Sequence, residues 1–115
     1  MIRRLAEEGR LSGAVVHGGL VWLAGQVADD ATLDTEGQTA DILAQIDALL
    51  AEAGSSKAHL LSVQIILRDI ADAPAMNRAW DAWLDQGNKP ARMTIQAPLV
   101  DPNWRVEITG VAAQP

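Results

Sequence analysis

The sequence contains no cysteine, no phenylalanine and no tyrosine among its 115 residues. The absence of cysteine excludes disulfide bonds, thiolate zinc sites and cysteine nucleophiles. Four tryptophans are the only large aromatic side chains, so the core must be built mainly from aliphatic residues and methionine. Hydrophobic residues still make up 49% of the chain, which argues against disorder. The length fits a single domain with a modest core.

Basic residues are scarce, with nine Lys and Arg against fifteen Asp and Glu, for a net charge of −6. This balance repels phosphate backbones, and only Arg3 and Arg4 are adjacent basic residues, so we expect no nucleic-acid partner. No apolar run approaches the length of a membrane span, so we expect no membrane partner either. Met1–Arg10 is charged and lacks the apolar segment of a signal peptide. We therefore expect a soluble, cytoplasmic protein.

Near the N-terminus the pattern predicts a hairpin. Ala14–His17 and Leu20–Ala24 are rich in β-branched and apolar residues and are expected to form strands. Gly18 and Gly19 between them suit a two-residue turn. Gly25-Gln26 is expected to end the second strand or to form a bulge.

The middle of the chain predicts two helices with a strand between them. Thr35–Ala53 carries apolar residues at three- and four-residue spacing and is followed by Gly54, a typical left-handed cap. The residues of this stripe are Ile42, Leu43, Ile46, Leu49, Leu50 and Ala53. Leu61–Leu67 is predicted to be a buried strand in which Leu61, Val63, Ile65 and Leu67 share one face.

The second helix is expected to begin after Asp72 as its N-cap, with Pro74 in the first turn, and to stop before Gly87 and Pro90. Its apolar stripe consists of Met76, Ala79, Trp80, Trp83 and Leu84. We interpret Trp80 and Trp83, at helical spacing, as core residues.

The last quarter of the chain predicts a second hairpin. Arg92–Ala97 and Trp104–Ala112 are expected to pair as antiparallel strands around a turn that contains Pro98, Asp101, Pro102 and Asn103. The fold class is therefore α+β, a mixed sheet with two helices packed on one face. The other face must be solvated or covered by a partner.

Alternation within this hairpin predicts which residues face the helices. The apolar residues are expected beneath the helices, namely Met93, Ile95, Ala97, Val106 and Ile108, and the polar residues between them are expected to face away. A turn centred on Leu99–Val100 would place Arg92 opposite Glu107, with Cβ atoms about 5 Å apart.

Arg92 and Glu107 are the best candidates for chemistry. A guanidinium group binds a carboxylate bidentately, and a nearby carboxylate can orient a water for attack on an electrophilic carbon. Together they suit hydrolysis of a small substrate that carries a carboxylate. Judged from spacing alone, a cross-strand salt bridge on a solvated face is the commoner explanation of such a pair.

Other candidate residues are individually weak. Asn77, next to Met76 of the helical stripe, could donate to a ligand, although an exposed Asn at this position needs no function. Gly25-Gln26 could bring backbone amides close to a ligand because glycine lacks a Cβ, or could be a plain bulge. His17 and His59 lie in different predicted elements without a clear carboxylate partner and make a poor metal site.

Several short motifs, taken in order and spacing, resemble the RidA (YjgF/YER057c/UK114) family. The resemblance extends from about Leu11 to Ala113. Each motif is short, and their common order makes the match specific. The motifs are Ala24-Gly25-Gln26, the helix end Ala51–Gly54, Asn77 before Trp80, Pro90-Ala91-Arg92 and Val106-Glu107-Ile108.

The resemblance implies that residues 1–115 form one RidA-like domain with a chorismate-mutase-like fold. It also implies that this domain assembles as a homotrimer. It implies an active site in each cleft between subunits, where Arg92 binds the substrate carboxylate and Glu107 positions the hydrolytic water. Gly25 and Asn77 would line the cleft. No cofactor and no metal are implied, and the family's usual substrates are 2-aminoacrylate-type enamines and their imines.

The sequence departs from the family pattern at four positions. Leu11 falls near the family's cleft tyrosine, Ala24 replaces a serine, Thr94 replaces a frequent cysteine and Thr109 replaces a second glutamate. Ala24 and Thr94 are still expected to line the substrate site. These altered walls leave the identity of the substrate open.

Two functions agree with these residues. The first is hydrolytic deamination of small enamine or imine intermediates, with Glu107 and Arg92 as catalytic residues. The second is a non-catalytic trimer that binds small carboxylate metabolites at Arg92. A ribonuclease activity, which the family's nomenclature also carries, is disfavoured by the acidic balance and by the lack of a basic, aromatic groove.

Overall fold

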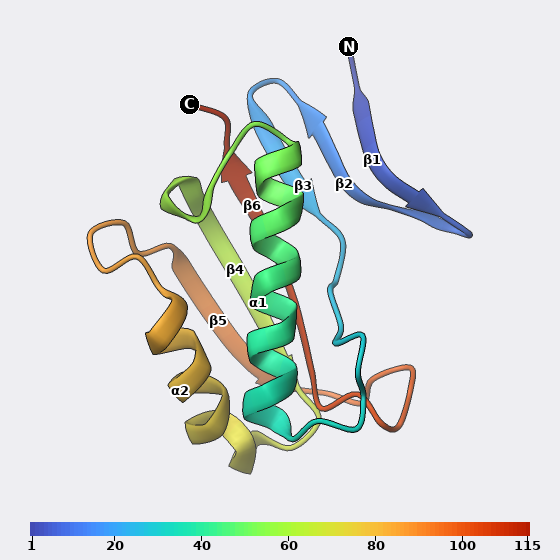
Figure 1. Ribbon diagram of the computed structural model, residues 1–115, viewed down its shortest axis with the longest axis vertical. Helices are drawn as coiled ribbons and strands as arrows, with labels where there is room; N and C mark the ends of the chain where they lie inside the picture. The colour runs from blue at the N-terminus through green and yellow to red at the C-terminus, as the bar shows by residue number, and fades with distance from the viewer.

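The computed structural model describes all 115 residues as one six-stranded sheet with two helices on one face (Figure 1). The strands are β1 (Arg3–Glu8), β2 (Leu11–His17), β3 (Leu20–Leu23), β4 (Leu60–Leu67), β5 (Ala91–Gln96) and β6 (Val106–Ala113). The helices are α1 (Thr35–Glu52) and α2 (Ala73–Trp83), with short 3-10 helices at Lys57–His59 and Ile70–Asp72. The strand order is β1-β2-β3-β6-β4-β5. Neither helix has the length and apolar character required to cross a bilayer.

The predicted N-terminal hairpin is confirmed, and a further strand precedes it. His17 pairs with Leu20 across the turn, where Gly18 and Gly19 have φ angles of 58° and 77°, values that favour glycine. The unpredicted strand β1 pairs antiparallel with β2 at the edge of the sheet. Sequence reasoning missed it because its charged side chains stay exposed, so no apolar alternation identifies it.

Helix α1 matches its prediction closely. The Asp34 carboxylate caps it by accepting a hydrogen bond from the Gly37 backbone N–H at 2.8 Å, and Gly54 follows its end with a φ of 76°. Helix α2 begins after Asp72 as expected, but that side chain does not cap it. The Asp72 carboxylate instead accepts a hydrogen bond from the Thr35 hydroxyl at 2.8 Å, which ties the starts of the two helices together.

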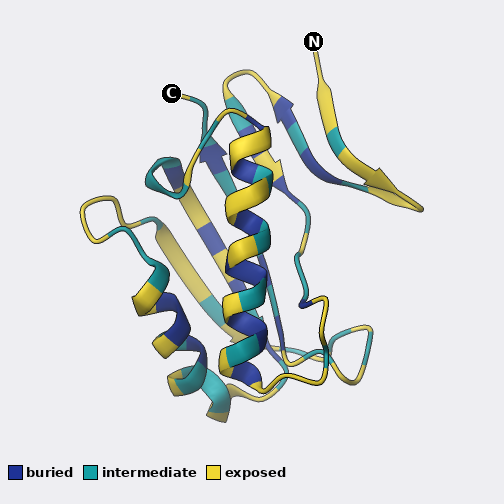
Figure 2. Cartoon of the chain, viewed as in Figure 1, coloured by how far each residue is buried: buried dark blue, intermediate teal, exposed yellow.

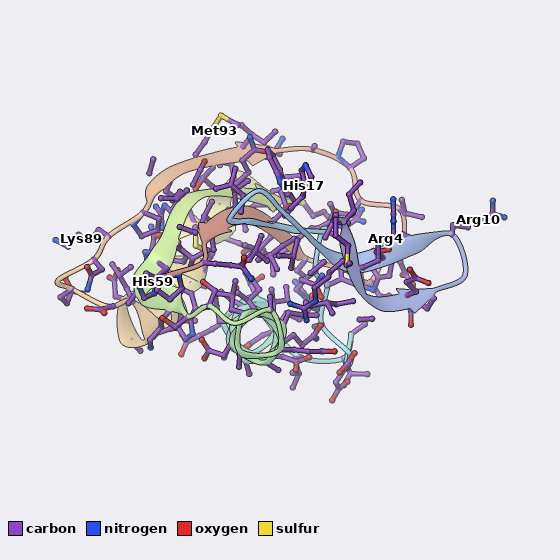
Figure 3. The ribbon with its side chains drawn as sticks, turned by 90° about the horizontal axis from the view of Figure 1, so that it is seen from above. Arg4, Arg10, His17, His59, Lys89 and Met93 are labelled. Carbon is purple, nitrogen blue, oxygen red and sulfur yellow. The ribbon has the colours of Figure 1, made fainter.

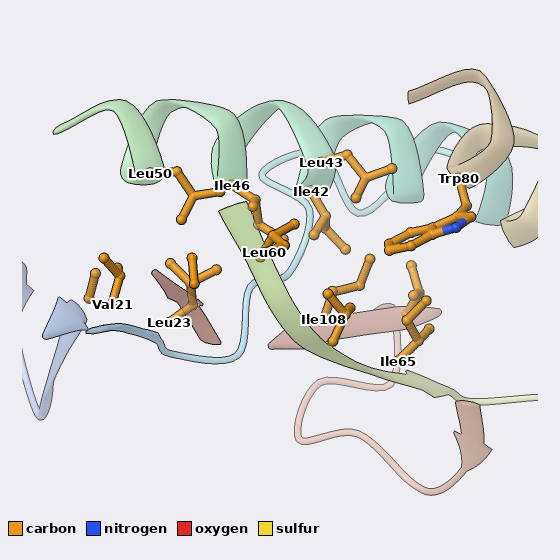
Figure 4. Close-up of a cluster of buried hydrophobic side chains, with 14 of the residues drawn as sticks. Val21, Leu23, Ile42, Leu43, Ile46, Leu50, Leu60, Ile65, Trp80 and Ile108 are labelled. Atoms are coloured by element: carbon orange, nitrogen blue, oxygen red, sulfur yellow. The ribbon is translucent and has the colours of Figure 1, made fainter. Parts of the chain in front are cut away.

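The hydrophobic core fills the space between the helices and the sheet. Side chains of α1, of Trp80 on α2 and of the central strands meet there (Figure 4). The helical surfaces that face the sheet are buried and the opposite surfaces are exposed (Figure 2). Complete burial of one large aliphatic side chain contributes about 1.5–3 kcal/mol. The core therefore holds the helices to one face only.

The predicted C-terminal hairpin is wrong, because β4 lies between β5 and β6. Strand β5 pairs with β4 in parallel, and β6 pairs with the other edge of β4 in antiparallel orientation. The α2 helix provides the crossover that a parallel β4–β5 pair requires. Residues 97–105 then carry the chain past the end of β4.

The expected facing of Leu61 is also wrong. The pairing of β4 with β6 is irregular between Leu60 and Ser62, which is the signature of a β-bulge. The bulge places Leu60 in the core at 6% exposure and leaves Leu61 49% exposed. The remaining apolar residues of β4, Val63, Ile65 and Leu67, are buried as predicted.

Candidate functional site

The facing predicted for β5 is reversed in the structure. Arg92 and Thr94 are aligned with Val63 and Ile65 of β4, which are buried beneath the helices. Neighbouring residues in register share a face, so Arg92 and Thr94 point toward α2. The apolar residues Met93 and Ile95 project from the opposite, open face and are 49% and 43% exposed. In Figure 3 the Met93 side chain lies on the side of the sheet away from α1.

The Arg92 guanidinium rests against one side of α2. Its Nη1 donates a hydrogen bond to Asn77 Oδ1 at 2.8 Å and approaches the Met76 sulfur at 4.0 Å. Its central carbon lies 5.2 Å from the centre of the Trp80 ring, within the range of a cation–π contact. Arg92 makes no ion pair, and its Nε and Nη2 donate no hydrogen bond within the chain. One whole edge of the guanidinium is therefore free to bind a planar anion.

Thr94 places an unpartnered hydroxyl near Arg92. Its Oγ1 is buried and has no hydrogen-bond partner in the chain. Residues two apart on a strand lie on the same face, so this hydroxyl shares the helix side of β5 with the guanidinium. Buried polar groups normally have a partner, and a ligand or water at this position would supply one.

The loop that enters β5 is held by its own hydrogen bonds. The side chain of Asn88 and the backbone N–H of Gly87 donate to the Asp85 carboxylate. These bonds hold the pKa of Asp85 below its ordinary value, because they stabilise the charged form.

Glu107 occupies a different position, against the backbone of Gly25. The segment that contains Gly25 runs beside β6, where Gln26 and Ile108 exchange backbone hydrogen bonds of 2.8 and 3.1 Å. A Cβ at Gly25 would lie only 2.9 Å from the Cδ atom of Glu107, so any other residue at this position would force the Glu107 side chain to move. The Glu107 carboxylate, half-buried, has no ion pair within the chain and no hydrogen bond.

The other residues of interest surround Glu107 or lie further off. Ala24, half-buried beside Gly25, accepts a hydrogen bond from the Gln26 side chain at 3.1 Å. The Thr109 hydroxyl donates to the Leu23 carbonyl at 2.6 Å. Thr109 also borders a hollow of about 230 Å³ on the open face of the sheet. Leu11 is 55% exposed at the start of β2.

Arg92 and Glu107 are not partners, which corrects both the predicted cross-strand pair and the salt bridge considered as its alternative. Arg92 aligns with Val63 of β4, whereas Glu107 aligns with Ile66, so the two side chains leave the sheet on opposite faces. Two strand spacings and a three-residue offset separate their Cα atoms by roughly 14 Å. One chain therefore carries two separate groups of candidate site residues. We call them the arginine half-site (Arg92, Asn77, Thr94 and Trp80) and the glutamate half-site (Glu107, Gly25 and Ala24).

Sequence reasoning identified every member of these half-sites except Trp80, which it interpreted as a core residue. Trp80 does belong to the core, at 5% exposure, but its ring also contacts the guanidinium. The available signal was its spacing, because residues three apart on a helix are surface neighbours and Trp80 follows Asn77 by three.

Comparison with known proteins matches the whole chain to one family. The family model described as Endoribonuclease L-PSP matches residues 1–114. The RutC family protein YoaB of Escherichia coli is 45% identical over 112 residues, which cover 97% of each chain. A crystal structure of NMB1025 from Neisseria meningitidis, described as a member of the YjgF protein family, has a TM-score of 0.96 at 46% identity. That match covers 100% of this chain and 96% of the other.

A more distant relative has a named activity. The 3-aminoacrylate deaminase RutC of Acinetobacter baylyi is 37% identical over 79 residues, covering 69% of this chain and 62% of that protein. The arrangement of sheet and helices, the whole-chain family match and the relatives above 40% identity agree with the resemblance found in the motifs around Gly25, Arg92 and Glu107. The chain belongs to the YjgF/RutC family.

Proposed function

We propose that the protein hydrolyses small enamine or imine intermediates that carry a carboxylate, in sites formed where two copies of the chain meet. The observation that carries the proposal is the pair of half-sites. Each presents a charged group with no ionic partner, Arg92 on one face of the sheet and Glu107 on the other. The relative named as a 3-aminoacrylate deaminase supports a reaction of this class.

In the proposed reaction the free edge of Arg92 binds the substrate carboxylate through Nε and Nη2. Glu107 accepts a hydrogen bond from a water and directs its oxygen at the imine carbon. An enamine substrate first tautomerises to the imine. As the C–O bond forms, the C=N electron pair moves to nitrogen, and Glu107 takes a proton from the water and passes it to that nitrogen. The C–N bond of the resulting carbinolamine then breaks as the hydroxyl proton moves to the leaving nitrogen, which releases ammonia and leaves a keto acid. The imine carbon is already electrophilic, so orientation and one placed water suffice, and the chemistry requires no cofactor.

Assembly would bring the half-sites together. The open face of the sheet exposes Trp22, Met93 and Ile95 at 50%, 49% and 43%, whereas both helices pack on the other face. An exposed apolar surface of this kind favours association. In a closed homotrimer, the glutamate half-site of one copy would meet the arginine half-site of its neighbour at each of three interfaces.

The first test is ammonia release from enzymatically generated 2-aminoacrylate, compared with the spontaneous rate. Glu107→Gln should slow turnover about a hundredfold and spare the affinity for 2-oxobutanoate measured by calorimetry. Arg92→Ala should weaken that affinity about ten- to a hundredfold. The control is Arg78→Ala, which removes the same charge from an arginine of α2 that pairs with Glu36 and should leave both readouts unchanged. Wild-type turnover equal to the spontaneous rate would reject deamination of this substrate.

Mixing the two variants tests whether each site combines two copies. Arg92→Ala and Glu107→Gln proteins, denatured and refolded together in equal amounts, should regain about a quarter of wild-type turnover, because one interface in four would join two intact half-sites. Separately refolded variants are the control. Absence of any regain, with mixed assembly confirmed by mass spectrometry, would contradict shared sites.

A non-catalytic trimer that binds carboxylate metabolites is the second candidate. It is favoured by the surroundings of Glu107, because Ala24 offers no hydroxyl and the hydroxyl of the nearby Thr109 is engaged with the Leu23 carbonyl. Under this function Arg92→Ala would still weaken binding of 2-oxobutanoate. No preparation, wild type included, would then accelerate imine hydrolysis.

A further inference from the structure

We propose that Trp80 is a positioning residue for Arg92, holding the plane of the guanidinium so that its Nε–Nη2 edge stays open to a carboxylate. The inference rests on the proposed role of Arg92 as the carboxylate-binding group. It assigns to a core tryptophan a second role beyond packing.

Three side chains, Trp80, Asn77 and Met76, contact the Arg92 guanidinium, and we call this arrangement the arginine seat. Trp80 lies beneath the guanidinium at 5.2 Å, Asn77 accepts from Nη1 at 2.8 Å, and the Met76 sulfur lies 4.0 Å from the same nitrogen. The amide contact fixes one corner of the guanidinium, and the aromatic ring restricts its tilt. Together they define the plane in which the remaining donors point.

All three contacts are electrically neutral. A carboxylate in this seat would occupy the in-plane N–H donors and neutralise the charge that a substrate must meet. An aromatic face attracts the cation from above and leaves those donors unused. Orientation is thus achieved without loss of binding capacity.

Trp80 is itself held rigidly from behind. It is 5% exposed, and its ring lies 5.5 Å from the ring of Trp83 at an angle of 52°. The Trp83 indole donates to the Asp47 carboxylate of α1 at 2.9 Å. The two indoles therefore link Arg92, which lies on an exposed edge strand, to α1, the longest helix of the fold.

Preorganisation of this kind should raise affinity. An arginine free to sample its rotamers must lose that freedom when a ligand binds, whereas a seated arginine has lost it already. Loss of the aromatic contact should weaken carboxylate binding about three- to thirtyfold. Because Arg92 would bind ground and transition states alike, KM should rise and kcat should stay within about twofold.

The first experiment is calorimetry with 2-oxobutanoate on three variants, each checked by circular dichroism and thermal unfolding. Trp80→Phe keeps an aromatic face and should stay within about threefold of wild type, whereas Trp80→Leu should show the full loss. Trp104→Leu is the control, since it removes an indole that makes no ring contact with Trp80 and no cation–π contact with Arg92. Equal affinity in Trp80→Phe and Trp80→Leu would overturn the inference, because a packing role alone would not distinguish a ring from an aliphatic chain.

The second experiment needs no ligand. The Nε–H resonance of Arg92, identified by its disappearance in Arg92→Lys, should carry a ring-current shift in wild type that is lost in Trp80→Leu. If Trp80→Leu does not fold, Trp80→Met preserves more flexible volume in the core and replaces it in both measurements. An unmoved resonance would overturn the inference even where Arg92 binds carboxylates. A shifted resonance in a protein that binds no carboxylate would leave the seat intact and reject the proposed function instead.

Discussion

Single residues hold the two charged groups of the candidate site in different ways. Arg92 is held by contacts with Asn77 and Trp80, whereas Glu107 is accommodated because Gly25 has no side chain. The contacts of Arg92 can be weakened stepwise by conservative substitutions, whereas any replacement of Gly25 adds a complete Cβ atom. The two groups therefore call for different mutations.

Gly25→Ala should displace the Glu107 carboxylate without unfolding the protein. The added methyl would lie 2.9 Å from Cδ of Glu107, and the flexible side chain must swing away. A displacement of about 1 Å at a catalytic group can cost about a hundredfold in rate, so turnover should fall strongly while affinity for 2-oxobutanoate is retained. Gly87→Ala, whose methyl would meet Asp85 at an ordinary 3.5 Å, is the control. Unaltered turnover in Gly25→Ala would exclude Glu107 from the reaction.

Thr94→Val should distinguish the effect of the buried hydroxyl on stability from its effect on ligand binding. Its Oγ1 has no partner in the chain, so valine should leave the free energy of unfolding unchanged or raise it by about 1 kcal/mol. Affinity for 2-oxobutanoate should fall about three- to tenfold if the hydroxyl bonds the ligand. Thr94→Cys, which keeps a weak donor, should change activity less than Arg92→Ala does.

The matched control for this change is Thr39→Val in α1. The Thr39 hydroxyl, also buried, donates to the Thr35 carbonyl at 2.7 Å, so its removal should lower stability by about 1 kcal/mol. Urea unfolding measures both variants. A loss of stability in Thr94→Val as large as in Thr39→Val would mean that the Thr94 hydroxyl has a partner.

Between the elements, one buried glutamine joins the two long loops at the end of the sheet. The two N–H groups of the fully buried Gln38 side chain are shared among the carbonyls of Ala31, Leu33 and Asn103, and its Oε1 accepts from the Arg105 backbone N–H. These bonds place the residue that leads into β6 and therefore the start of the strand that carries Glu107. Arg68 supports the same loop through the carbonyls of Trp104 and Asp101, at 2.8 and 2.7 Å.

Gln38→Met, close in volume, should lower the free energy of unfolding by about 2–4 kcal/mol because it leaves buried backbone groups without partners. Gln45→Met on the same helix removes a single hydrogen bond, to the Val27 carbonyl at 3.0 Å, and should cost about 1 kcal/mol. Urea unfolding curves of the two variants provide the comparison. Equal losses would show that Gln38 does not organise the loops.

Among the secondary-structure elements, the helices and the first hairpin could be predicted from sequence, whereas the pairing of the last two strands could not. The stripe from Ile42 to Leu50 reports which surface of α1 is buried, and it does so without knowledge of any partner. The apolar residues of β5 misled because Met93 and Ile95 lie on the open face. Alternation separates the two faces of a strand but does not say which face the helices cover.

For the whole molecule, the proposed trimer depends on the open face of the sheet. We expect light scattering at micromolar concentration to report three times the mass of one chain. Ile95→Lys, which places a charge on the open face, should release monomers and abolish turnover, because burial of an unpaired charge at an interface is costly. Ile70→Lys is the control, since Ile70 is similarly exposed, at 49%, but lies outside the sheet. A monomeric wild type, or a trimeric Ile95→Lys, would contradict assembly through this face.

The sequence by itself determined the fold class, the extent of α1 and the first hairpin, and it named most of the candidate site residues. These properties follow from local periodicity, from turn residues and from the chemistry of single side chains. Only the tertiary structure decided that β4 separates β5 from β6, and hence that Arg92 and Glu107 leave opposite faces. Strand neighbours are joined by backbone N–H and C=O groups that every residue except proline shares, so the pattern of side chains does not name the neighbour. Helix α2, which connects β4 to β5, allows these strands to pair in parallel, but only the folded sheet shows that they are neighbours.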